Sequence, residues 1–237
     1  MSFRRIGIMG GTFDPIHWGH LEAAFAAEAA LKLMRLLVVP SNVPPHRQSP
    51  RASGYHRFAM VGLAVAGRNG WRASDLELRN ESESFTSETL RKFHDRGYAA
   101  AELFFIIGAD AFSEIASWKD YPAVLEYAHF AVVARPGYPI SDLPHRLPKL
   151  ADRMVKPPLD TISHLDPMIV LVDAPTSDTS ATAIRGRRAQ GESIAGLVPD
   201  PVRQHIEQHG LYTSQTPGRR ASDTESTPAA GRLHGED

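Results

Sequence analysis

Residues 4–20 read Arg-Arg-Ile-Gly-Ile-Met-Gly-Gly-Thr-Phe-Asp-Pro-Ile-His-Trp-Gly-His, and this stretch indicates the fold class most directly. Apolar side chains alternate at Ile6 and Ile8, which predicts a strand over 4–9. The glycine pair that follows predicts a turn, and apolar residues near a 3.6 period then predict a helix over 18–34. A strand, a glycine turn and a helix in this order are typical of a parallel α/β unit.

Short apolar segments alternate with helical segments along the rest of the chain. Strands are predicted at 36–39, 103–107, 130–134 and 169–172, with a weaker edge strand at 71–79. Helices are predicted at 54–66, 86–94, 180–188 and 201–208. The alternation predicts a Rossmann-like, doubly wound parallel sheet with helices on both faces. Ligands bind such sheets at the carboxyl ends of the strands, so functional residues are expected in the loops there.

Composition excludes several classes of protein. The 237 residues carry 26 Lys and Arg against 27 Asp and Glu, and this balance removes the electrostatic argument for nucleic-acid binding. The absence of cysteine excludes a disulfide scaffold, a thiolate zinc site and a cysteine nucleophile. No apolar run is long enough for a membrane-spanning helix, and the N-terminus lacks the features of a signal peptide. A cytoplasmic location without membrane partners is therefore expected.

The last residues differ from the rest of the chain. Residues 214–237 contain one large apolar side chain, Leu233, among small, polar and charged residues. Such a segment has too little apolar surface to offset the entropy of ordering. We therefore predict a single domain over 1–213 and a disordered C-terminal tail over 214–237. The sequence does not indicate the oligomeric state.

The loop after the first predicted strand has the chemistry of a phosphate site. Gly10 and Gly11 allow the backbone N–H groups to approach a ligand closely, and the N-terminus of the helix favours anions. His17 and His20 are three residues apart at the start of that helix, so they share one face. The spacing matches neither a dinucleotide fingerprint nor a P-loop. A tight turn with incidental histidines is one alternative, and a metal pair is another, but a third ligand is not found nearby in the sequence.

The pattern Gly-Gly-Thr-Phe-Asp-Pro-x-His-x-Gly-His resembles the T/H-x-G-H signature of the nucleotidylyltransferase superfamily. Further segments resemble the bacterial nicotinate-mononucleotide adenylyltransferases, in family order over residues 6–212. They read Pro-Ser-Asn-Val-Pro-Pro-His-Arg (40–47), Phe-Thr with Thr-Leu (85–90), Ile-Ile-Gly-Ala-Asp (106–110), Trp (118), Arg-Pro-Gly-Tyr (135–138), Ser-Ala-Thr-Ala-Ile-Arg (180–185) and Gly-Leu-Tyr (210–212). One departure is Thr179, where the family usually has Ile or Val.

The resemblance implies adenylyl transfer from ATP to nicotinate mononucleotide, in NAD biosynthesis. The catalytic residues that it implies are His17, His20 and Arg185. The ATP-binding residues that it implies are Gly10, Gly11, Thr12, Phe13, His17, His20, Gly108, Asp110, Ser180 and Arg185. The residues implied for nicotinate mononucleotide are His46, Arg47, Thr86, Trp118 and Arg135. No dedicated metal site is predicted, because no carboxylate cluster is evident, and Mg²⁺ is expected to enter with ATP.

On the ATP side, ordinary structural explanations compete with these roles. Ser180 fits a helix N-cap, and Asp110 fits the N-cap of the helix after 103–107. Arg185 is flanked by residues that suit a solvated helix. The resemblance instead makes Arg185 the guanidinium that binds the phosphates, a role that its permanent charge and forked donors suit.

On the nicotinate side the same choice arises. Thr86 can be an N-cap, or it can bind the nicotinate carboxylate at a helix start. Trp118 can be a core residue or can stack on the nicotinate ring. His46 and Arg47 can form a solvated turn or face the mononucleotide phosphate. Contact between Arg135 and the substrate is left open.

Three other functions were weighed. Pantetheine-phosphate adenylyltransferase belongs to the same superfamily, but the Arg-Pro-Gly element, Trp118 and the chain length disfavour it. A non-catalytic nucleotide-binding regulator is disfavoured because His17, His20 and Arg185 are all present. An aminoacyl-tRNA synthetase would need a tRNA-binding domain, for which 1–213 leaves no room.

Overall fold

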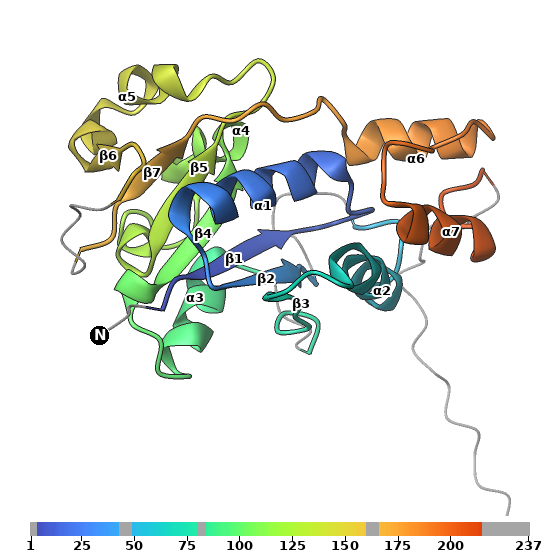
Figure 1. The fold of residues 1–237 in the computed structure, drawn as a ribbon, viewed down its shortest axis with the longest axis horizontal. Helices are drawn as coiled ribbons and strands as arrows, with labels where there is room; N and C mark the ends of the chain where they lie inside the picture. Colours follow the sequence, from blue (N-terminus) through green and yellow to red (C-terminus); the bar gives the residue numbers. More distant parts are fainter. Residues whose placement is uncertain (1–3, 43–48, 80–83, 160–165, 215–237) are drawn as a thin grey trace, which may run out of the picture.

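The computed structural model describes residues 4–42, 49–79, 84–159 and 166–214. Seven parallel strands form one sheet in the order β3-β2-β1-β4-β5-β7-β6 (Figure 1). The strands are β1 (Ile6–Gly11), β2 (Arg35–Pro40), β3 (Trp71–Ala73), β4 (Leu103–Gly108), β5 (His129–Val133), β6 (Met154–Val155) and β7 (Ile169–Val172). The predicted fold class is confirmed.

Most of the helices lie between strands in chain order, and the last two follow the last strand. The helices are α1 (Trp18–Leu31), α2 (Gly54–Val65), α3 (Thr86–His94), α4 (Ala109–Phe112), α5 (Leu143–Arg146), α6 (Ala181–Ala189) and α7 (Asp200–Gln208), with short 3-10 turns between some of them. None of the helices in the described part of the chain has both the length and the apolar composition needed to cross a bilayer.

Strand β4 shows why the sheet is covered on both faces. Phe104 and Ile106 point into one apolar layer, which also contains the buried sides of α1, α2, α6 and α7. Leu103, Phe105 and Ile107 point into the other layer, with α3, α4 and α5. Because side chains alternate along a strand, an unbroken apolar run such as Leu-Phe-Phe-Ile-Ile is buried only between two layers.

The direction in which the chain winds reverses between β1 and β4. From β1 the chain proceeds outward to β2 and β3, whereas β4 begins the other half of the sheet and leads to β5 and β7. Strands β1 and β4 are hydrogen-bonded neighbours. Such a reversal of strand order is where open α/β sheets bind ligands. The ends of these two strands, at Gly11 and Gly108, therefore face the same site.

Four expectations differ from the structure. The glycine pair does not form a turn, because Gly10 and Gly11 are the last two residues of β1 and the turn lies at residues 14–15. Helix α1 ends at Leu31 rather than residue 34, because Lys32 takes a left-handed conformation (φ 52°) and turns the chain into β2. The predicted edge strand over 71–79 is limited to Trp71–Ala73, and Leu78 instead bonds back to Asp75 in a turn. Strand β6 was missed, since two residues carry no periodicity.

Some predictions fall outside the described residues. His46 and Arg47 lie there, and so does the predicted tail from residue 215 onward. The single domain over 1–213 stays a prediction.

Candidate active site

The two histidines of the first loop lie against each other at the N-terminus of α1. His17 is the N-cap residue and His20 lies in the first turn, with ring centroids 3.7 Å apart. The backbone N–H of His17 donates to His20 Nδ1 (3.3 Å), so a neutral His20 carries its proton on Nε2. Phe13 meets His20 edge to face, with ring centroids 5.0 Å apart. The site therefore presents two imidazoles in one fixed orientation.

His17 is held in the uncharged form. Its side chain is 2% exposed, and burial, followed by the nearby charge of Arg135, lowers its pKa from 6.5 to about 3. His17 Nδ1 is also buried without a hydrogen-bond partner among the described residues. Buried polar atoms usually have partners, and exceptions are common at functional sites. His17 is therefore a neutral imidazole at physiological pH.

Gly19 allows a cation to approach these histidines. Arg135, which follows β5, donates from Nη1 to the Gly19 carbonyl oxygen (3.2 Å). A Cβ at position 19 would lie 3.0 Å from that nitrogen and 3.1 Å from the Thr179 carbonyl oxygen. Glycine is needed for this close packing. Arg135 thus lies on the histidine side of the site, beside His17.

Arg185 reaches the same loop from the distant helix α6. Its Nη1 donates to the Asp14 carbonyl oxygen (2.7 Å), 171 residues away in the sequence. Its Nη2 donates to Thr182 Oγ1 (3.1 Å). Helix α6 is capped by Ser180, whose hydroxyl accepts from the Ala183 N–H (3.1 Å). Ser180 is thus a helix cap, and Arg185 is oriented toward the β1–α1 loop rather than dispersed in solvent.

The end of β4 lies beside the end of β1. Gly108 is the N-cap of α4, so the predicted N-cap role of Asp110 is wrong: it lies within the first turn. A Cβ at Gly108 would collide with the Asp110 carboxylate and would lie 3.1 Å from Arg135 Cγ. A side chain at 108 would therefore displace both groups.

The residues assigned to the nicotinate ring lie on two facing segments. Thr86 is the first residue of α3, with Phe85 at the N-cap, so the capping role predicted for Thr86 is also wrong. Trp118 packs edge-on against Phe105, with ring centroids 6.3 Å apart. The segments are linked by the ion pair between Lys119 and Glu88 (2.6 Å). Lys119 also lies 4.1 Å from the centroid of the Phe85 ring.

Comparisons with known proteins identify the family to which the chain belongs. The Cytidylyltransferase-like family profile matches residues 8–187. An Escherichia coli O17:K52:H18 protein named "Probable nicotinate-nucleotide adenylyltransferase" is 38% identical over 208 residues, which cover 86% of this chain and 97% of the relative. A protein of the same name from E. coli O139:H28 is equally similar. The chain belongs to the nicotinate-nucleotide adenylyltransferase family.

Solved structures share the fold of this family member. The nicotinic acid mononucleotide adenylyltransferase of Plasmodium falciparum, complexed with NaAD, superposes with a TM-score of 0.65 at 17% identity. Its complex with APC gives a TM-score of 0.64. Each match covers 88% of this chain and 97% of the other. At this identity the likeness concerns the fold.

The structure adds a buried arginine that the sequence analysis missed in this family member. Arg57 on α2 is 1% exposed and donates to the carbonyl oxygens of Thr12 (2.8 Å) and Ser41 (2.6 Å). Burial lowers its pKa, an effect opposed by Asp14. Arg57 therefore ties the loop after β1 to the loop after β2. The signal was present in the sequence, because position 57 shares a helix face with the apolar residues 61 and 64.

Asp14 is the second residue that the sequence analysis missed. Its carboxylate is 6% exposed and accepts from the N–H groups of Arg51 (2.8 Å) and Ala52 (3.1 Å). The Tyr212 hydroxyl donates to the same carboxylate (2.7 Å), and burial, followed by Asp14, raises the pKa of Tyr212. The C-terminal end of the fold is thereby bonded to the loop that carries the histidines. Asp14 and Tyr212 both lie in motifs that the sequence analysis quoted, but their spacing in the sequence does not show that they are bonded to each other.

Proposed function

We propose that this member of the family transfers the adenylyl group of ATP to the 5′-phosphate of nicotinate mononucleotide. An oxygen of that phosphate attacks the α-phosphorus of ATP, the bond from that phosphorus to the α,β-bridging oxygen breaks, and pyrophosphate leaves. The product is nicotinate adenine dinucleotide. The observation that carries the proposal is the convergence of His17, His20 and Arg185 on the β1–α1 loop, at the reversal of strand order.

The reaction needs no protein nucleophile. The attacking phosphate is already ionised at neutral pH, so catalysis consists of alignment and of stabilising the charge that develops on the phosphate oxygens. Fixed hydrogen-bond donors in a partly buried site serve both purposes. Gly10 and Gly11 let the backbone close on the phosphates, and Phe13 holds the His20 ring.

Each of the three polar side chains has a distinct role in this proposal. His20 donates from Nε2–H to a phosphate oxygen, since its Nδ1 accepts from the backbone. His17 acts as a neutral polar group and not as an imidazolium, because its pKa is about 3. Arg185 supplies the permanent positive charge for the departing pyrophosphate. Ser180 fixes the start of its helix.

Mg²⁺ is proposed to enter as part of the ATP complex. Asp14, the carboxylate of the β1–α1 loop, already accepts three hydrogen bonds, so it is poorly placed to bind a cation. The ion is then held by phosphate oxygens and water, as Mg²⁺ commonly is in nucleotide sites. It neutralises phosphate charge; the residues described above orient the ATP that carries it. Asp110 and Gly108 are proposed to receive the adenosine.

The nicotinate ring is proposed to lie between α3 and Trp118. Thr86 and the N-terminus of α3 would bind its carboxylate, and the indole would stack on the ring. The ion pair from Lys119 to Glu88 supports this by holding the two segments together. His46 and Arg47 are kept as partners of the mononucleotide phosphate, and Arg135 as a residue beside the reacting groups.

The test is pyrophosphate release with ATP and, in turn, nicotinate mononucleotide, nicotinamide mononucleotide and phosphopantetheine. An amide in place of the carboxylate leaves donors unpaired, at a cost of about 1–3 kcal/mol. We expect kcat/KM to be about ten- to a hundredfold higher for the acid substrate. Thr86→Val should narrow that ratio with little change in the KM for ATP. Turnover of phosphopantetheine alone, or an equal rate with the nicotinamide nucleotide, would overturn the assignment.

A further inference from the structure

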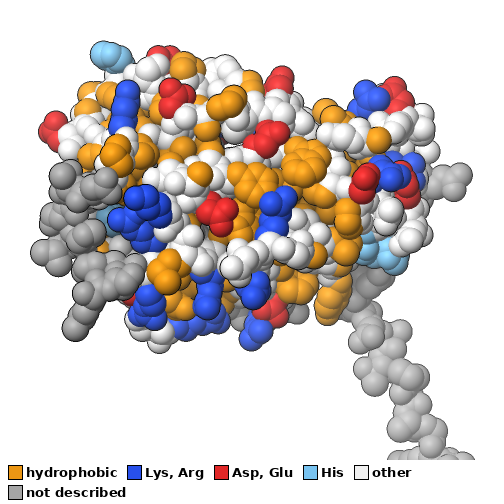
Figure 2. Space-filling view, in the orientation of Figure 1, with side chains coloured by type: hydrophobic (Ala, Val, Ile, Leu, Met, Phe, Trp, Pro, Cys, Tyr) orange, Lys and Arg blue, Asp and Glu red, His pale blue; other side chains and the backbone are white. Residues whose placement is uncertain are grey.

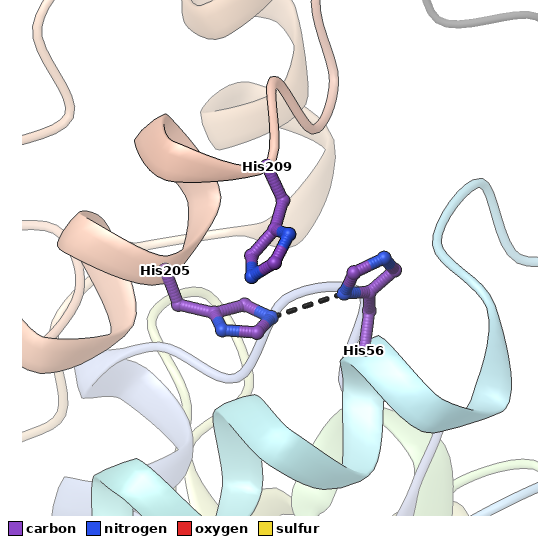
Figure 3. A group of neighbouring side chains, drawn as sticks. All are labelled: His56, His205 and His209. Atoms are coloured by element: carbon purple, nitrogen blue, oxygen red, sulfur yellow. Dashed lines mark hydrogen bonds between the residues drawn. The ribbon is translucent and has the colours of Figure 1, made fainter.

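Three histidines meet on the surface away from the proposed catalytic residues. His56 projects from α2, and His205 and His209 project from the end of α7, with their rings directed toward one another (Figure 3). One ligand atom from each lies within 4.8 Å of the other two. His56 Nδ1 and His205 Nε2 are 3.1 Å apart. The sequence analysis found no metal site because these helices are distant in the sequence and become neighbours only in the fold.

The spacing fits a bound divalent ion. Zinc–nitrogen bonds of about 2.0–2.1 Å in a tetrahedral site place two ligand nitrogens about 3.3 Å apart. The pair from α2 and α7 is already near that value. His205 and His209 are one helical turn apart, as in many two-histidine zinc sites, so small ring rotations bring His209 into place.

The histidines are accessible to solvent. His56 and His205 are half-buried and His209 is exposed, so an ion can enter from solvent and water can complete its coordination. Histidine side chains are visible on the molecular surface where α2 meets α7 (Figure 2).

We propose that His56, His205 and His209 form a binding site for a divalent transition-metal ion of the zinc type, which joins α2 to α7. Each of the joined helices carries or leads to a residue that bonds to the loops of the candidate active site. Arg57 follows His56 and bonds to the loops after β1 and β2, and Tyr212 follows α7 and bonds to Asp14. An ion between the helices therefore stabilises the framework around the β1–α1 loop without touching the substrates.

The test is calorimetric titration of Zn²⁺ into the full chain, without an affinity tag and stripped with a chelator. We expect one equivalent to bind in the micromolar range or more tightly. That equivalent should be lost in His209→Ala, whose exposed side chain is not needed for folding, and in His56→Ala. The matched control is His145→Ala, an exposed histidine of α5, which should bind as the parent does.

Thermal melts provide a second readout. At a Zn²⁺ concentration about a hundredfold above Kd, the parent and His145→Ala should gain about 5–10 °C in Tm, and His209→Ala should gain almost nothing. Co²⁺ should give the visible absorption spectrum of a tetrahedral site in the parent and should not give it in His209→Ala. Equal zinc affinity in the parent and His209→Ala would overturn the proposal, because the ion would then be bound elsewhere, for example at His17 and His20. A parent that binds no zinc would overturn it as well.

Discussion

The two sides of the candidate active site are held together by different kinds of interaction. On the side proposed for the phosphates, His17, Asp14 and Arg57 are 2%, 6% and 1% exposed, and the side chains of Asp14 and Arg57 bond to backbone groups of several loops. On the nicotinate side, the ion pair between Lys119 and Glu88 has side chains 42% and 34% exposed. The side proposed for the phosphates is held by buried hydrogen bonds, and the side proposed for the nicotinate ring by an exposed ion pair.

This difference has a chemical reason. Transition-state stabilisation by fixed dipoles needs groups that do not reorganise during the reaction. A buried hydrogen-bond network such as that of Asp14 and Arg57 is rigid, because breaking any one bond leaves a buried polar group unpaired. Exposed ion pairs contribute little and are easily exchanged for water. The structure is therefore rigid at the proposed site of chemistry and more adaptable between α3 and Trp118, where the nicotinate ring is proposed to bind.

The largest effect is expected when the buried network loses its cation. Arg57→Met should lower the free energy of unfolding by about 3–5 kcal/mol, because it leaves buried carbonyl oxygens without a donor and removes a buried cation that interacts favourably with Asp14. Urea denaturation followed by circular dichroism measures this loss. The control is Arg79→Met, which removes an exposed arginine paired with Asp75 and should leave the urea midpoint nearly unchanged. Similar midpoints for both variants would show that the network is not what holds the loops.

A slightly smaller effect is expected on turnover alone. His20→Ala should lower kcat by about 10²–10³, equivalent to about 2.7–4 kcal/mol, because it removes a donor aimed at developing charge. Its Tm should change by only a few degrees, since the side chain is half-buried. His145→Ala serves again as the neutral control. A His20→Ala enzyme that keeps more than about a third of the parent kcat would refute the catalytic role.

The buried His17 should appear in the pH dependence of stability. The unfolded chain takes up a proton at this residue near pH 6.5, and the folded chain only near pH 3. Acid therefore favours the unfolded state across this window, at about 1.4 kcal/mol per pH unit, and has no such effect above pH 6.5. Compared with His17→Asn, the parent should lose about 2 kcal/mol more between pH 6.5 and 5. Parallel stability curves for the two proteins would contradict the low pKa.

The smallest effect is expected on the nicotinate side. Lys119→Met breaks the exposed pair with Glu88 and should cost less than about 1 kcal/mol of folding stability. Chemical denaturation measures this cost, and steady-state kinetics should show a change in the KM for nicotinate mononucleotide rather than in kcat. A loss as large as that of Arg57→Met would erase the contrast between the two sides.

The local sequence by itself determined the fold class and the loop that carries His17 and His20. Alternating apolar segments set the strands and helices, and an uninterrupted apolar run such as 103–107 requires two covered faces. His17 and His20 were placed together by spacing alone, because three residues along a helix start bring side chains to one face. Boundaries such as the end of α1 were less accurate, since a left-handed residue has no periodic signal.

Only the tertiary structure decided which distant residues meet. Arg185 bonds to Asp14, Tyr212 bonds to the same residue, and three histidines of α2 and α7 converge, although no local pattern links them. The physical reason is that burial and polar pairing depend on the packing of whole elements, whereas periodicity reports only which face of one element is apolar. The spacing of residues along the chain thus determined which side chains share one helical turn. The winding of the sheet determined which distant residues surround them.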